Sequence, residues 1–295
     1  MTENTSQAVS QTFRAALVQT CTGRDVARNI ETVSALVAKA AAAGAHYVQT
    51  PEVTVLMTAD RDELFARTAP EAGNPALTAF SALARRTSVW LHIGSMAIQT
   101  GSGKLANRSF LFGPDGSLAA RYDKIHMFDV DISKGDTYWE SQRYVAGDRG
   151  VVVDLPWGRL GMTICYDMRF PGLFRALAHA GAQIITVPSA FTVPTGQAHW
   201  HTLLRARAIE TQCFVLAAAQ AGEHESGRKT YGHSLIISPW GEILGEGGDL
   251  HNSLTYADIN LADVHDARRR VPSLTHDRAF TIVEAPETVA TEPAQ

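Results

Sequence analysis

The chain has 295 residues, 45% of them hydrophobic, and a formal net charge of −4, which suits one large globular domain or two small ones. It contains no long basic or acidic block, so we expect neither nucleic acid nor an anionic membrane as a partner. No apolar run approaches the roughly 18 residues that a membrane span needs, and the polar residues 1–12 lack the apolar core of a secretory signal.

In the first half of the chain, apolar strand patterns alternate with helical ones. We predict strands at 13–19, 47–50, 89–98 and 108–112, and helices at 25–43 and 74–87. Asn74 is expected to cap the second helix, with Pro75 at its first position. The stretch 122–149 is longer than an ordinary connection, and such loops are usually functional or disordered. Its aromatic side chains argue against disorder.

The alternation continues in the second half. We predict strands at 159–165, 183–188, 213–219, 233–238, 242–245 and 253–258, and helices at 173–180, 197–211 and 261–270. We find no linker and no repeat, so we expect one α/β domain over residues 13–284, with 1–12 and 285–295 as flexible tails. Hairpins mixed with helical crossovers suggest helix-covered sheets, with one sheet behind the other.

The chain has three cysteines, Cys21, Cys165 and Cys213, which cannot all pair with one another. Reduced thiols in a cytoplasmic protein are therefore expected. We expect Cys21 and Cys213 to pack as small hydrophobic residues, which is common for free cysteine.

Cys165 lies where a buried strand meets the turn before a helix. Backbone N–H groups at such a turn can lower the pKa of a thiol and can bind an oxyanion, which favours a nucleophile. The alternative is a small buried hydrophobic residue. The local context leaves both interpretations open.

Glu52 and Lys124 also follow predicted strands, and sites in open α/β sheets form at the carboxyl ends of strands. If these side chains met Cys165, the carboxylate could take the thiol proton and the ammonium could hold the charge on an attacked carbonyl oxygen. That set would hydrolyse an amide through a thioester. The alternative for Glu52 and Lys124 is a surface or salt-bridged pair.

The segments around these residues resemble the three signature regions of the nitrilase superfamily of carbon–nitrogen hydrolases. They are Thr50-Pro-Glu52, Tyr122-Asp-Lys-Ile-His126 and Ile164-Cys-Tyr-Asp-Met-Arg-Phe170. The resemblance implies a four-layer α-β-β-α sandwich. Because the thiol, carboxylate and ammonium suffice for amide hydrolysis, we expect no metal and no cofactor. The resemblance also implies Glu52 as general base, Lys124 as stabiliser of the tetrahedral intermediate and Cys165 as nucleophile. A homodimer or higher homo-oligomer is implied too, with the helices near 173–180 and 197–211 at the interface.

The same resemblance extends to substrate binding. Glu140 matches a second glutamate that helps position the substrate, and the backbone N–H of Tyr166 would complete the oxyanion site. Arg169, Arg228 and Lys229 are candidates for binding substrate carboxylates.

Finer motifs, among them Trp139-Glu-Ser141, Ser189-Ala-Phe191 and Thr230-Tyr-Gly-His-Ser234, resemble the amidase branch and, within it, the deaminated-glutathione amidases. This implies cleavage of the small 2-oxo acid amide that joins a 2-oxoglutaryl group to cysteinylglycine. Alternatives are ω-amidase activity on 2-oxoglutaramate or 2-oxosuccinamate, and N-carbamoyl-amide hydrolysis.

One position departs from the family pattern, because Gly172 stands where a glutamate usually follows Arg-Phe-Pro. We expect the partner of Arg169 to differ, and the turn to be looser or the pocket more open.

Two other groups of residues were weighed as functional candidates. His199 and His201 are two positions apart, which does not make them neighbours on a helix face, so we predict no metal site there. Arg205 and Arg207 flank the apolar stripe of the same helix and are expected in structural ion pairs.

Overall fold

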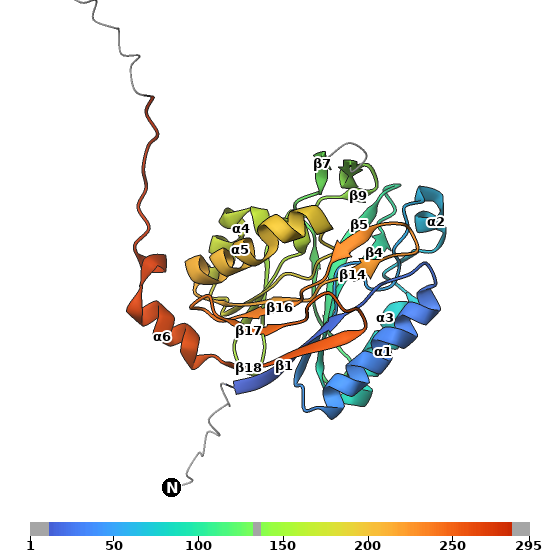
Figure 1. Cartoon of the computed structure of the whole chain (residues 1–295), viewed down its shortest axis with the longest axis horizontal. Coiled ribbons are helices and arrows are strands. Elements are labelled where there is room, and N and C mark those ends of the chain that lie inside the picture. Colours follow the sequence, from blue (N-terminus) through green and yellow to red (C-terminus); the bar gives the residue numbers. More distant parts are fainter. Residues whose placement is uncertain (1–11, 132–136, 285–295) are drawn as a thin grey trace, which may run out of the picture.

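The structure, a computed structural model, describes residues 12–131 and 137–284. Two β-sheets lie face to face between two pairs of helices (Figure 1). This arrangement confirms the four-layer α-β-β-α sandwich. The predicted tails lie outside the described residues, except Thr12, with which the first strand begins.

The larger sheet carries the first half of the chain and the last strand. Its order is β18 (Ser253–Asn260), β1 (Thr12–Gln19), β2 (Tyr47–Gln49), β4 (Trp90–Gln99), β5 (Leu105–Phe112) and β6 (Leu118–Asp123), with β3 (Ala69–Pro70) beside β4 and β9 (Tyr144–Val145) beside β5. β1, β2 and β4 are parallel, whereas β18, β5 and β6 pair antiparallel with their neighbours.

The smaller sheet is built from the second half of the chain. Its order is β10 (Val151–Asp154), β11 (Arg159–Met162), β12 (Ile184–Thr186), β13 (Phe214–Ala217), β16 (Leu235–Ile237) and β17 (Ile243–Glu246). Two small hairpins lie outside the sheets, β7 (Asp129–Asp131) with β8 (Thr137–Trp139), and β14 (Ala221–Glu223) with β15 (Lys229–Tyr231).

Helices cover the outer face of each sheet (Figure 1). The larger sheet is covered by α1 (Val26–Ala42) and α3 (Pro75–Thr87), and the smaller sheet by α4 (Pro171–His179) and α5 (Val193–Thr211). The remaining helical segments are α2 (Arg61–Ala66), α6 (Ala262–Arg270) and the 3₁₀ turns η1 (Glu140–Gln142), η2 (Cys165–Arg169) and η3 (Ser273–Thr275).

β1 illustrates why the strands are continuous apolar runs in the sequence. Phe13, Ala15 and Leu17 belong to the core between the two sheets, whereas Ala16 and Val18 belong to the core under α1 and α3. Because both faces of the strand are buried, polar and apolar residues do not alternate along it.

Several predicted boundaries shift in the structure. Asn74 caps α3 and Pro75 opens it, as predicted. α5 begins at Val193 and not at residue 197, because Pro194 is tolerated in the first turn of a helix. The predicted strand 159–165 ends at Met162, and Cys165 begins η2.

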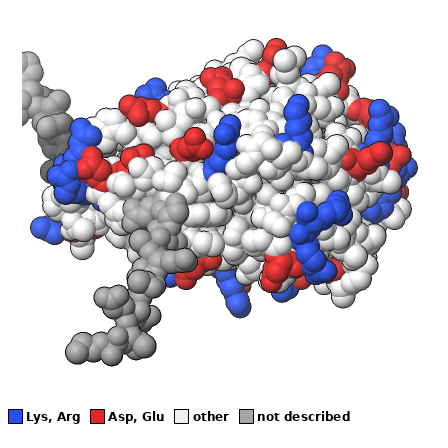
Figure 2. All heavy atoms as spheres, turned by 90° about the horizontal axis from the view of Figure 1, so that it is seen from below, with Lys and Arg blue, Asp and Glu red and all other residues white. Residues whose placement is uncertain are grey.

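Acidic and basic side chains are interspersed over the face shown in Figure 2. Among the described residues, no helix is both long and apolar enough to cross a membrane.

Candidate active site

Glu52 lies three residues beyond the end of β2 and is buried, with 5% of its surface exposed. Its Oε1 accepts hydrogen bonds from Asn107 Nδ2 at 2.9 Å and Lys124 Nζ at 3.0 Å, and its Oε2 accepts one from the backbone N–H of Ala190 at 2.9 Å. These donors come from both halves of the chain, so the carboxylate lies where the two sheets meet.

Lys124 follows β6 directly and is only 2% exposed. Its Nζ lies 2.8 Å from Glu140 Oε2 as well as 3.0 Å from Glu52 Oε1. Glu140 also accepts from the backbone N–H of Phe128 at 2.7 Å. Two carboxylates therefore hold one buried ammonium between them.

Cys165 begins the η2 turn in a left-handed conformation, with φ at +49°. Such a conformation is uncommon for a residue with a side chain. Its backbone N–H donates to Pro188 O at 3.0 Å, and the Glu52 carboxylate is near enough to raise the pKa of its thiol. Residues held in sparsely populated conformations cluster at active sites.

Asp167, fully buried, fixes this turn. Its Oδ2 accepts from the backbone N–H of Ile164 at 2.8 Å and from the hydroxyl of Tyr122 at 2.7 Å. Its Oδ1 lies 3.0 Å from the backbone N and 2.7 Å from Nδ1 of His126. The carboxylate thus ties the turn that presents Cys165 to the segment that carries Lys124.

Burial raises the pKa of the Cys165 thiol to about 12, and the nearby Glu52 carboxylate adds to the rise. Burial alone would raise the pKa of Glu52 too, but the Lys124 ammonium outweighs it and holds this pKa below its usual value. Despite burial, Glu140 and Glu52 keep the pKa of Lys124 well above its usual value. The resting site therefore contains a neutral thiol, a carboxylate and an ammonium.

A backbone N–H does lower the pKa of Cys165, but it belongs to Ala190 and not to the η2 turn. Burial and the Glu52 charge outweigh this N–H and the Lys124 ammonium, so the net change in the thiol pKa is a rise.

The three groups open into a cavity of about 510 Å³. Its lining includes Asn107, Phe128, Tyr138, Trp139, Arg143 and Arg228. Such a volume is typical of small-molecule sites.

Glu140 lines this cavity with the three groups above, whereas Tyr166 and Arg169, in the same η2 turn as Cys165, are not among its lining residues. The Tyr166 ring packs edge-on against Phe128 and Phe170. The guanidinium of Arg169 lies 3.2 Å from His199 Nδ1 and over the rings of Tyr166 and Phe191. The roles of Tyr166 and Arg169 in substrate positioning stay predictions.

The departure at Gly172 leaves the turn intact. Gly172 is exposed at the start of α4, and a Cβ built there would meet no atom within 4 Å. The turn is held by Asp167, and Arg169 has His199 as its partner.

Sequence reasoning missed Asn107, which donates to Glu52 at 2.9 Å and to Glu140 at 3.1 Å through the same amide nitrogen. It lies inside β5, and the only sign of it in the sequence is a polar residue within an apolar strand pattern.

Arg228, one of three cationic candidates for binding substrate carboxylates, lines the cavity. Its Nη2 donates to Ala190 O at 2.5 Å, while its buried Nε has no partner among the described residues.

The other singled-out residues lie elsewhere. Lys229 forms an exposed ion pair with Glu223, and Cys213 is buried against Ala182. Arg205 donates to the backbone carbonyl of Gly241 and has no carboxylate partner in residues 12–131 and 137–284, so its predicted ion pair is not found there. Arg207 pairs with Glu210, as predicted.

A thiol, a carboxylate and an ammonium that converge on one cavity are suited to acyl transfer from an amide. The model of the carbon–nitrogen hydrolase family matches residues 14–269. The chain belongs to this family, and it is a hydrolase of carbon–nitrogen bonds other than peptide bonds.

Individual relatives agree with this assignment. The chain is 42% identical over 266 residues to a deaminated glutathione amidase of Yersinia enterocolitica, which covers 89% of this chain and 92% of the relative. It is 35% identical over 268 residues to the omega-amidase NIT2 of Mus musculus, covering 91% and 96%. The crystal structure of Saccharomyces cerevisiae Nit3, a member of branch 10 of the nitrilase superfamily, superposes with a TM-score of 0.83 at 29% identity, covering 92% of this chain and 98% of that chain.

Proposed function

We propose that the chain is an amidase that cleaves small 2-oxo acid amides through a thioester on Cys165, with deaminated glutathione as its preferred substrate. The observation that carries this proposal is the buried hydrogen bond between Lys124 and Glu52 in the wall of a cavity that Cys165 also lines. Glu52 is the general base, Lys124 the charge stabiliser and Cys165 the nucleophile.

In the first half-reaction, Cys165 Sγ attacks the amide carbonyl carbon while its proton passes to Glu52. Because the thiol pKa is about 12 and that of Glu52 is low, a separated thiolate would be scarce. The proton is therefore transferred as the sulfur–carbon bond forms. The oxygen that gains negative charge is held by the Lys124 ammonium and the backbone N–H of Tyr166.

Glu52 then gives this proton to the nitrogen of the leaving amine, and the carbon–nitrogen bond breaks. Cysteinylglycine departs, and the 2-oxoglutaryl group stays on sulfur as a thioester. In the second half-reaction, water attacks the thioester, and Glu52 takes a proton from that water. The proton returns to sulfur as 2-oxoglutarate leaves, which restores the starting site.

Two observations support a 2-oxoglutaryl amide as the substrate, and the first of them favours deaminated glutathione. The 42% identical relative carries the name deaminated glutathione amidase. Arg228 brings a cation to the cavity wall with its Nε lacking a partner among the described residues, so it could bind the carboxylate of the 2-oxo acid.

The second candidate is ω-amidase activity on 2-oxoglutaramate, favoured by the 35% identity to omega-amidase NIT2. Both substrates share the same 2-oxoglutaryl group. Arg228 would serve either one, and only the leaving amine distinguishes them.

The proposal extends to assembly and location. We place a homodimer or higher homo-oligomer interface over α4 and α5, where Ile209 and nearby Trp240 are about half exposed. Contiguous exposed apolar side chains mark interaction sites.

We place the protein in the cytoplasm, since its three free thiols suit a reducing compartment.

The test compares kcat/KM for deaminated glutathione and for 2-oxoglutaramate on the purified protein. We expect the larger value for deaminated glutathione, because a pocket that fits its cysteinylglycine half binds that transition state better. Equal and poor values on both would contradict the substrate assignment.

The mechanism is tested with Cys165→Ala, which should release no product and form no thioester detectable by mass spectrometry. Cys213→Ala removes another buried thiol and is the matched control, with turnover retained. Wild-type turnover in Cys165→Ala would contradict the thioester.

A further inference from the structure

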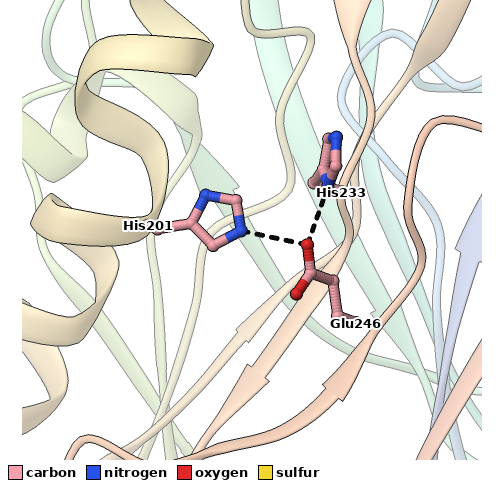
Figure 3. Close-up of side chains that lie close together, drawn as sticks. All are labelled: His201, His233 and Glu246. Atoms are coloured by element: carbon pink, nitrogen blue, oxygen red, sulfur yellow. Dashed lines mark hydrogen bonds and ion pairs between the residues drawn. The ribbon is translucent and has the colours of Figure 1, made fainter.

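Three side chains that are not part of the cavity lining converge beside α5 (Figure 3). His201 comes from α5, His233 from the segment between β15 and β16, and Glu246 from the end of β17. His201 Nε2 lies 3.1 Å and His233 Nδ1 lies 2.8 Å from the same oxygen, Glu246 Oε1. The ligand atoms of all three residues lie within 4.8 Å of one another.

The backbone around this cluster is fixed by contacts that do not involve its side chains. Trp200, the neighbour of His201, donates from Nε1 to the carbonyl of His233 at 2.7 Å. On the other side, Glu246 is paired with Leu235 in the β16–β17 hairpin, and Gly247 N donates to Ser234 O at 2.9 Å. The backbone positions of the three residues are therefore fixed by the fold before any ion binds.

Tyr231 orients the two imidazoles. Its ring stacks on His233 with centroids 4.3 Å apart and 26° between the planes, and it meets His201 edge-on at 6.1 Å. Gly196, one turn earlier on α5, makes room for this ring, because a Cβ there would lie 2.3 Å from Tyr231. Groups that hold metal-ligating side chains in place strengthen metal binding.

The spacing fits a tetrahedral zinc ion. With bonds of about 2.0–2.2 Å to nitrogen and oxygen, two ligand atoms of such a site are about 3.3 Å apart. The two observed separations of 3.1 and 2.8 Å need only small movements to match. The side chains are 24–38% exposed, so solvent can reach the cluster and supply a water as the remaining ligand.

We propose that His201, His233 and Glu246 bind one divalent transition-metal ion per chain, with Zn²⁺ as the ion that this set of two imidazoles and a carboxylate favours. The ion would join α5 to the β16–β17 hairpin. This proposal departs from the expectation that the chain binds no metal. For His201, that expectation considered only His199 as a second ligand, and His199 lies beside Arg169.

The test uses the full chain without a histidine tag, stripped of metal, in a Cys21→Ser/Cys165→Ser background that removes the more accessible thiol ligands. Zn²⁺ is titrated by calorimetry, and we expect one equivalent per chain. His201→Ala, His233→Ala and Glu246→Gln should each weaken Zn²⁺ binding at least about tenfold. His199→Ala, on the same helix, is the control and should bind as the background does.

Zn²⁺ should also raise the thermal midpoint of the background protein and not that of the three variants, because an ion that binds only the folded state stabilises it. Glu246→Gln keeps the side-chain volume, so its Zn²⁺ affinity tests the proposal even if an alanine variant does not fold. The proposal fails if the background protein binds no equivalent of Zn²⁺, or if Glu246→Gln binds it as tightly. Those results would leave the cluster as an ion pair between two histidines and a glutamate.

Discussion

Lys124 and Glu52 form an ion pair of 3.0 Å in which both side chains are almost fully buried. With Glu140 at 2.8 Å, the ammonium balances two carboxylates that water cannot solvate. Removing one partner of a buried pair leaves an uncompensated charge.

Lys124→Met should therefore lower the free energy of unfolding by about 3–5 kcal/mol and abolish turnover. Urea unfolding measures the first effect. Lys229→Met is the matched control, because Lys229 and Glu223 are each 64% exposed, and such a pair contributes at most about 1 kcal/mol. An equally small effect of Lys124→Met would show that the buried pair does not stabilise the fold.

Glu52→Gln should separate ionisation of the thiol from catalysis. Burial raises the Cys165 pKa to about 12 with help from the Glu52 charge, so this variant should lower that pKa. Turnover should nevertheless fall at least about 100-fold, because the general base is lost. The measurement is the pH dependence of iodoacetamide alkylation at Cys165, followed by mass spectrometry, beside kcat.

In the wild type, alkylation should keep rising past pH 9.0, the ordinary thiol value, toward 12. In Glu52→Gln the rise should begin at lower pH. Glu223→Gln, on the surface, should match the wild type in both measurements. A thiol pKa that stays near 12 in Glu52→Gln would contradict the electrostatic account of the site.

The three residues that we propose as catalytic are each embedded in a short local motif just after the end of a strand. Glu52, Lys124 and Cys165 could be named from the sequence, and the fold followed from the family that those motifs indicate. Asn107 could not be named, since its role depends on two carboxylates 55 and 33 positions away. A polar residue inside a strand gives no local sign of such partners.

Elements that depend on tertiary contacts were also missed. α2 has only six residues, and a helix this short is marginal without tertiary packing. The cluster of His201, His233 and Glu246 combines a helix with two segments more than 30 positions further along. The spacing of residues along one helix cannot reveal such a group.

Asp167→Asn should destabilise the turn that presents Cys165. Asp167 is fully buried, and each of its oxygens accepts from the backbone N–H of another residue. An amide NH₂ in place of one oxygen cannot accept, so at least one buried donor loses its charged partner, at a cost of about 3 kcal/mol. Urea unfolding of Asp154→Asn, whose carboxylate is 74% exposed, is the control and should change far less. Equal losses in the two variants would contradict the role of Asp167.

Gly172→Ala should stabilise the protein. Gly172 is the second residue of α4, it is exposed, and nothing lies within 4 Å of an added Cβ. Alanine restricts the unfolded chain more than glycine does, which favours folding by about 0.4–1 kcal/mol. Thermal unfolding should show the gain while kcat/KM stays unchanged. A loss of activity would mean that the turn needs the glycine, contrary to its open surroundings.

Arg228→Gln should weaken binding of acidic substrates selectively. Arg228 lines the cavity, and its Nε has no partner among the described residues. Hydrogen bonds to charged groups contribute about 1.5–3 kcal/mol, so KM for deaminated glutathione should rise at least about tenfold. KM for a neutral aliphatic amide should change little, because that substrate has no carboxylate to lose contact with. Lys229→Gln, one residue along and paired with Glu223 on the surface, should leave both KM values as they are. If the two substrates lose affinity equally in Arg228→Gln, the arginine shapes the cavity wall and does not bind the carboxylate.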